Sequence, residues 1–238
     1  MIILLTKLTS TEKQISNASE TTHCAAVLLS LLHSKYKVVE GSLTAVHAAT
    51  SQQRTVDSLS SYKDWRAGRS IANNIIPAST GASQALGHVL PELKGKVNAG
   101  AYRVPTVDVS VLDLVVRVEQ PPQGGYDEVL KMLREASEGS SSKTGSPAYS
   151  SGFRGLGLGG AERETGGNLH HLIQVTDEPA VSTDFIGRTE SAIVDAQAGM
   201  MIGERLIKLV AWYDNEWGYS RRLVELILFV AKKEKERK

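Results

Sequence analysis

Apolar residues follow helical and extended patterns that alternate along the chain. Small hydrogen-bonding residues at Asn17 and Ser19 precede apolar side chains with helical spacing through Leu32, which predicts a helix capped by one of the two. The valine-rich residues 37–49 predict a strand that ends near His47. The pattern further predicts a strand over 2–8, an ordered loop over 57–77, helices over 82–90, 126–136 and 220–233, and strands over 107–119, 172–175, 192–196 and 206–212.

The strand expected over 107–119 changes its inward face partway along. Its apolar residues occupy odd positions through Val111 and even positions from Leu112 onward. Successive side chains of a strand point to opposite faces, so this change requires a bulge or a bend. We therefore expect an irregularity near Val111.

Residues 140–168 are rich in Ser and Gly and lack periodicity, so they predict a flexible insertion. Within this segment Gly155, Gly157 and Gly160 match the spacing of a dinucleotide-binding motif. The pattern predicts no strand before these glycines and no amphipathic helix after them. This context favours a linker over a nucleotide site.

The length of 238 residues allows one large domain with a proper core. We expect the main domain over 17–231, after a remnant strand and link over 1–16. A charged tail follows over 232–238, where Lys and Arg alternate with Glu234 and Glu236. This alternation is typical of a solvated helix end and does not favour nucleic-acid binding.

Charge and cysteine content narrow the possible partners. The formal net charge is only +1, so the chain is not predicted to bind nucleic acid. The apolar start of the chain is interrupted at Lys7 and is too short for a membrane span, so no membrane binding is predicted. The single cysteine, Cys24, excludes an internal disulfide and a cysteine-cluster metal site, so we expect no metal. It also suits a reducing compartment, and we expect a cytoplasmic protein.

Five short segments carry the chemistry of the chain. They read SNASETTHC at 16–24, TAVHAAT at 44–50, NIIPASTGA at 74–82, YRVPT at 102–106 and WYDNEWGYS at 212–220. In this order and at these spacings they resemble the catalytic domain of the glyceraldehyde-3-phosphate dehydrogenase family. The resemblance extends over 17–138 and 171–231. It implies an α/β fold of the α+β kind, with a mixed, largely antiparallel sheet and helices on one face.

The resemblance also implies a site. In the family a cysteine at a helix N-terminus attacks the aldehyde, a histidine activates it, NAD accepts the hydride and phosphate releases the acyl group. His47 matches the histidine, and both an imidazolium and a helix N-terminus stabilise a thiolate. The other matched positions are Thr50 and Arg103 for the substrate phosphate, Ser19, Thr21, Thr80 and Gly81 for inorganic phosphate, and Asn215 for the nicotinamide.

Two positions depart from the family pattern. Glu20 stands at the nucleophile position and His23 at a family asparagine. A carboxylate cannot replace the thiolate, because it adds weakly and reversibly to an aldehyde and its acyl product would be an anhydride. Cys24 matches a second, non-nucleophilic cysteine, and we expect a buried structural thiol there rather than a rescue of activity. We expect Glu20 to contact His47 by an ion pair or hydrogen bond.

The family places a doubly wound NAD-binding sheet before the nucleophile segment, where this chain has sixteen residues. NAD is therefore the implied family cofactor, although we expect this chain not to bind it alone. The first hypothesis is a degenerate phosphorylating dehydrogenase domain, inactive alone. Its alternatives are a subunit that receives a cofactor domain from another chain, a regulatory module, and a fragment without a selected function. The partners we expect are a second copy or a full-length dehydrogenase subunit, with a small phosphorylated ligand.

Overall fold

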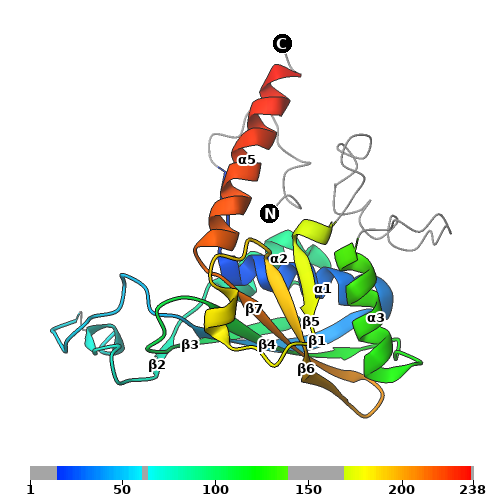
Figure 1. The fold of residues 1–238 in the computed structure, drawn as a ribbon, viewed down its shortest axis with the longest axis horizontal. Coiled ribbons are helices and arrows are strands. Elements are labelled where there is room, and N and C mark those ends of the chain that lie inside the picture. The colour runs from blue at the N-terminus through cyan, green and yellow to red at the C-terminus, as the bar shows by residue number, and fades with distance from the viewer. Residues whose placement is uncertain (1–14, 61–63, 139–168, 237–238) are drawn as a thin grey trace.

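The computed structural model describes residues 15–60, 64–138 and 169–236 (Figure 1). They form one sheet whose strands lie in the order β2-β3-β1-β4-β7-β6-β5. β1 pairs in parallel with β3, as β5 does with β6, while the other neighbouring strands are antiparallel. The strands are β1 (Val38–His47), β2 (Ile76–Ala78), β3 (Val97–Arg103), β4 (Ser110–Val118), β5 (Ile173–Thr176), β6 (Ala192–Ile202) and β7 (Leu206–Tyr213).

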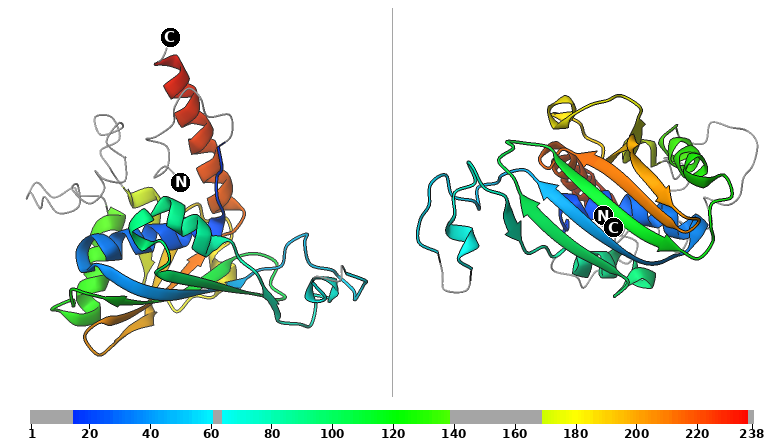
Figure 2. Two further views of the ribbon diagram at one scale, coloured as in Figure 1. Left: turned by 180° about the vertical axis from the view of Figure 1, so that it is seen from behind. Right: turned by 90° about the horizontal axis from the view of Figure 1, so that it is seen from below.

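The helices lie on one side of this sheet, and the view from below shows the strands of its other face (Figure 2). α1 (Glu20–Tyr36), α2 (Ala82–Val89) and α3 (Gly125–Glu138) cover the sheet, while α5 (Trp217–Lys235) projects away from it (Figure 1). Short 3-10 turns lie at Arg66–Gly68, Pro91–Leu93, Leu169–His171 and Ser182–Phe185. The expected mixed, largely antiparallel sheet with helices on one side is therefore confirmed. Within the described ranges, no helix is long and apolar enough to cross a bilayer.

The core lies between α1 and the sheet. The α1 side chains from Thr21 through Leu32 are all buried, because this helix packs across the middle strands of the sheet and against α2 and α5. In β4 the even positions from Leu112 to Val118 are completely buried, while the odd positions are partly exposed. The period of two expected for a sheet with one covered face is thus present.

The irregularity expected near Val111 lies two residues earlier. Val109 adopts a left-handed backbone conformation with φ of 64°, which is strained for a β-branched residue. From Ser110 onward β4 keeps an unbroken register with β7. The bend therefore precedes the strand, and it turns Val109 into a separate cluster with Phe185 and Ile193.

One other expectation differs from the structure. Strands β2 and β3 were not expected, and the loop predicted over 57–77 ends in the first of them. The charged residues from 232 to 235 form the last turn of α5, in agreement with the solvated helix end expected there. The strand expected over 2–8 and the insertion expected over 140–168 lie outside the described residues.

Candidate active site

Three elements meet at the candidate site. Ser19 caps α1, since its hydroxyl accepts a hydrogen bond from the Thr22 amide at 3.1 Å, and Glu20 is the first residue of the helix. β1 ends at His47 and its parallel neighbour β3 ends at Arg103, directly opposite in register. Because parallel strands end at the same edge, the helix start and both strand ends bring these side chains together.

Glu20 and His47 are in direct contact, as the sequence predicted. The Oε1 atom of Glu20 lies 2.7 Å from Nε2 of His47, whose side chain is 4% exposed. The Nδ1 atom lies 2.8 Å from the Ala48 carbonyl oxygen and 2.5 Å from Nη1 of Arg103. An ionised carboxylate only accepts hydrogen bonds, so Nε2 of His47 carries the proton in this contact.

The surroundings of Glu20 keep it charged. Burial alone would raise the pKa of its carboxyl group. The hydrogen bond from His47, the amide of Glu20 itself and the charges of His47 and Arg103 outweigh burial and hold that pKa below its usual value. Glu20 therefore supplies a fixed negative charge at the start of α1, where the helix dipole also favours an anion.

A buried hydrogen-bond network, which the sequence analysis missed, joins the start of α1 and the end of β1 to the neighbouring strands β4 and β7. The Tyr213 hydroxyl lies 2.9 Å from the Thr21 hydroxyl, and its ring meets the His47 ring edge-on at 6.2 Å. Ser110 accepts a hydrogen bond from the Ala48 amide at 3.0 Å and donates one to Asn215 at 2.9 Å. The alternating pattern of β7 was the available signal for Tyr213, because it places this residue on the covered face.

The remaining phosphate positions, Thr50, Thr80 and Gly81, make hydrogen bonds to close neighbours in the chain. Thr50 donates its amide and hydroxyl hydrogens to Gln53, at 2.9 and 3.1 Å. Thr80 accepts a hydrogen bond from the Ala82 amide at 3.2 Å, and Gly81 caps α2. Among the described residues, no hydrogen bond joins Thr80 or Gly81 to Glu20 or His47. Of the predicted phosphate residues, Arg103 contacts His47 directly, and the assignment of the others to phosphate stays a prediction.

His23 and Cys24 point into the interior. Nε2 of His23 lies 2.7 Å from the Asn17 carbonyl oxygen, its ring stacks on Tyr219, and burial lowers its pKa to about 4. Cys24 is completely buried, and burial raises the pKa of its thiol. The expectation of a buried structural thiol is confirmed.

The free space beside the pair is small. The space between residues that include Glu20, His23, Tyr213 and Tyr219 is too small to hold a water molecule. Pockets that enclose small organic ligands usually measure about 300–1,000 Å³, so the described site has no preformed pocket of that size. In the described part of the chain, no group of three or more His, Cys, Asp or Glu side chains is placed to hold a metal ion.

Known proteins are similar in sequence to this chain over most of its length. Residues 19–215 match the family model described as the C-terminal domain of glyceraldehyde 3-phosphate dehydrogenase. The chain is 46% identical over 230 residues to glyceraldehyde-3-phosphate dehydrogenase of Schizophyllum commune, and this alignment covers 97% of the chain and 59% of the relative. It is 47% identical to glyceraldehyde-3-phosphate dehydrogenase 1 of Agaricus bisporus, covering 93% and 58%. It is 48% identical to the cytosolic glyceraldehyde-3-phosphate dehydrogenase of Chlamydomonas reinhardtii, covering 94% and 57%. The chain therefore spans somewhat more than half the length of these curated relatives.

Proposed function

Because the chain belongs to the glyceraldehyde-3-phosphate dehydrogenase family, we propose that it is a degenerate catalytic domain that does not oxidise aldehydes on its own. The observation that carries this proposal is the 2.7 Å contact between Glu20 and His47. The resemblance assigns these positions to the nucleophile and to the histidine that activates it. A carboxylate thus stands where the reaction requires a thiolate.

Cys24, the one cysteine of the chain, cannot replace the missing nucleophile. Cys24 lies one helical turn beyond Glu20 and is fully buried. Its raised pKa keeps it protonated at neutral pH, and a protonated thiol is a poor nucleophile. Attack by Cys24 would require α1 to move within the core, since the helix packs against the sheet on all its middle turns.

NAD is the cofactor implied by the family, and we propose that this chain does not hold it alone. Asn215, which matches the nicotinamide position, is only 6% exposed. Its amide oxygen accepts from Ser110, and its amide nitrogen donates to Glu216 at 3.2 Å. The side chain therefore does not fit a nicotinamide amide without giving up these partners. When bound to the family's enzymes, NAD supplies the hydride acceptor.

A direct activity assay tests the proposal. The purified 238-residue chain is mixed with glyceraldehyde 3-phosphate, phosphate and NAD, with the enzyme from Schizophyllum commune as the positive control. We expect no NADH above the protein-free rate. Sustained NADH production by the chain would overturn the proposal, and loss of that activity in Cys24→Ala would identify the buried thiol as the nucleophile.

A second candidate function is an interaction or regulatory subunit in the cytoplasm that joins a full-length dehydrogenase or a second copy. The observation that favours it is the exposed apolar surface of the segment between β1 and β2. Leu59 is 91% exposed, and Trp65 and Ile75 are each about two-thirds exposed. Co-purification with a full-length relative tests this role, with Leu59→Glu as the variant that should weaken binding. Absence of any complex would leave the degenerate domain as the better account.

A further inference from the structure

The two ring nitrogens of His47 face different partners. Nε2 lies 2.7 Å from Oε1 of Glu20. Nδ1 lies 2.5 Å from Nη1 of Arg103 and 2.8 Å from the carbonyl oxygen of Ala48. The imidazole is 4% exposed, so these protein groups, more than solvent, decide which ring nitrogen carries a proton.

The guanidinium group of Arg103 limits where the protons of His47 can lie. An arginine side chain has N–H donors and no acceptor, so Nη1 can bond only to an Nδ1 atom that has a free lone pair. A proton on Nδ1 would point two donors at each other across 2.5 Å. Nη1 also donates to the Ala48 carbonyl oxygen at 3.2 Å, so this oxygen has a partner without the imidazole. The contact therefore requires an unprotonated Nδ1.

The charges of the cluster favour the same arrangement. Glu20 is ionised and the guanidinium of Arg103 is cationic, so a neutral imidazole between them leaves the cluster without net charge. An imidazolium would place a second cation against Arg103 where almost no water reaches, and an unbalanced buried charge is costly. Burial raises the pKa of Tyr213, whose ring meets the imidazole edge-on, so this neighbour adds no charge at neutral pH.

We propose that Arg103 is a positioning residue that holds His47 as a neutral imidazole with its one proton on Nε2. In this form Nε2 donates a hydrogen bond to Glu20 and has no lone pair with which to accept a proton. A general base needs a free lone pair directed at the proton that it removes. His47 is therefore a hydrogen-bond donor towards position 20, and not a base. This consequence rests on the proposed function, to which it adds a second cause of inactivity.

Nitrogen NMR of the full chain tests the inference directly. Long-range proton–nitrogen spectra distinguish a ring nitrogen that carries a proton from one that does not. The signals that disappear in His47→Gln identify His47 among the six histidines of the chain. At pH 7 we expect a protonated Nε2 and an unprotonated Nδ1 in the parent. A proton on Nδ1, with or without one on Nε2, would overturn the proposal.

Arginine variants test the role of Arg103 in the same spectra. Arg103→Leu removes the donor, so Nδ1 should gain a proton that it donates to the Ala48 carbonyl oxygen, and its signal should move to the protonated range. Arg103→Lys keeps a cationic donor and should keep Nδ1 unprotonated. The matched control is Arg117→Leu, which removes an exposed arginine paired with Glu40 and should leave the His47 signals unchanged. An unprotonated Nδ1 in Arg103→Leu would overturn the role of Arg103.

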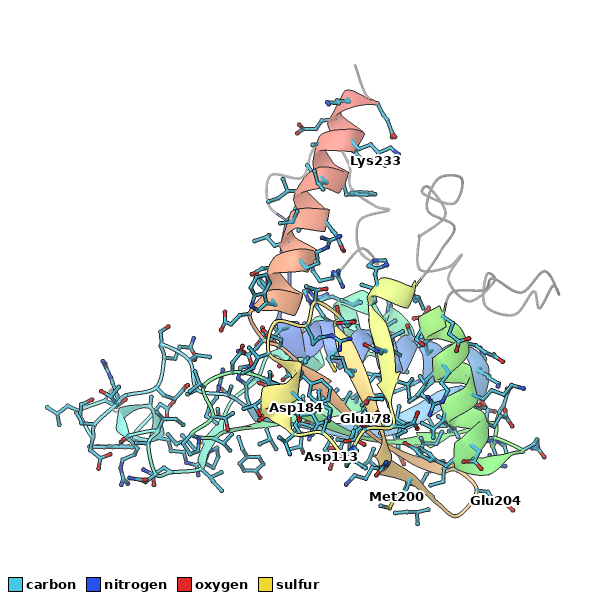
Figure 3. All side chains as sticks on the ribbon, in the orientation of Figure 1. Asp113, Glu178, Asp184, Met200, Glu204 and Lys233 are labelled. Carbon is cyan, nitrogen blue, oxygen red and sulfur yellow. The ribbon has the colours of Figure 1, made fainter. Side chains whose placement is uncertain are left out.

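A glutamate variant tests whether Glu20 sets the position of the proton instead. Glu20→Gln keeps an oxygen acceptor without the charge, so the proton should stay on Nε2. The control is Glu204→Gln, because Glu204 lies in the turn between β6 and β7, at the far end of β7 from Tyr213 (Figure 3). A proton that moves to Nδ1 in Glu20→Gln would contradict the proposal. NADH production by the parent would overturn the proposed function and leave these NMR results unchanged, so the two failures are distinguishable.

Discussion

Arg103 and His47 lie opposite each other in the parallel register of β3 and β1, with Nη1 of the arginine 2.5 Å from Nδ1 of the imidazole. Arg103 also donates to the Ala48 carbonyl oxygen at 3.2 Å. The guanidinium thus holds the imidazole from one side, while Glu20 contacts it from the other at 2.7 Å. This arrangement makes the charge of Glu20 part of the stability of the fold.

Glu20→Gln should lower the free energy of unfolding by about 1.5–3 kcal/mol at pH 7, the usual worth of a hydrogen bond to a charged group. The lowered pKa of Glu20 means that this stability is present above the unfolded-state pKa, near 4.5, and is lost as the pH falls through the folded-state pKa. Urea unfolding from pH 7 to pH 3.5 measures it. The exposed control Glu204→Gln should show no such difference, and a constant difference across the pH range would contradict the prediction.

Tyr213→Phe should destabilise the chain by about 1–2 kcal/mol, because it leaves the buried Thr21 hydroxyl without its partner. The aromatic ring remains, so no cavity forms. Denaturant unfolding at neutral pH gives the value, with Tyr102→Phe as a control on a tyrosine that is 43% exposed. Equal stabilities for parent and Tyr213→Phe would show that the hydroxyls do not bond.

Asp108→Asn should raise the melting temperature at pH 7. Burial and the neighbouring carboxylates of Asp214 and Glu216 raise the pKa of Asp108, so its ionised form opposes folding at neutral pH. A raised pKa gives a stability that is present at low pH and is lost as the pH rises through the folded-state value. The gain from asparagine should therefore vanish near pH 3.5. Thermal unfolding at both pH values tests this, and a gain that persists in acid would contradict it.

Glu20→Ala should bind inorganic phosphate several-fold more tightly than the parent. In the parent the carboxylate occupies the start of α1 beside His47 and Arg103, and it repels a phosphate dianion there. Titration calorimetry with phosphate compares the two proteins, with Glu204→Ala as the control for loss of a surface charge. Equal affinities would place phosphate binding away from this helix start.

The sequence was informative where local patterns decide structure. The cap at Ser19, the alternation of β4 and the limits of α2 follow from residues close together in the chain. Strand β3 was missed because Asn98, Ala99, Gly100 and Ala101 show no apolar alternation. Its strand conformation depends on pairing with β1 on one side and β2 on the other. Such pairing involves residues far apart in sequence.

The same distinction holds for the candidate site: contacts within known motifs were predicted, and contacts between distant segments were not. The family motifs led to the Glu20–His47 contact, since both residues belong to segments of fixed geometry. The contact of Arg103 with Nδ1 depends on the register of two parallel strands 56 residues apart in the chain. The bond between Thr21 and Tyr213 joins residues 192 positions apart. The sequence alone could not predict that these residues lie within hydrogen-bond distance of each other.

The central claim is that Glu20 occupies the thiolate position of a site that is otherwise able to activate a thiol. The most direct measurement is the rate of iodoacetamide labelling of Glu20→Cys at pH 7. The parent is the control, because its one thiol is buried. His47, Arg103 and the start of α1 should depress the pKa of the new cysteine, so we predict labelling at least about tenfold faster than that of an exposed cysteine introduced at Ser220. Labelling no faster than at position 220 would contradict the account.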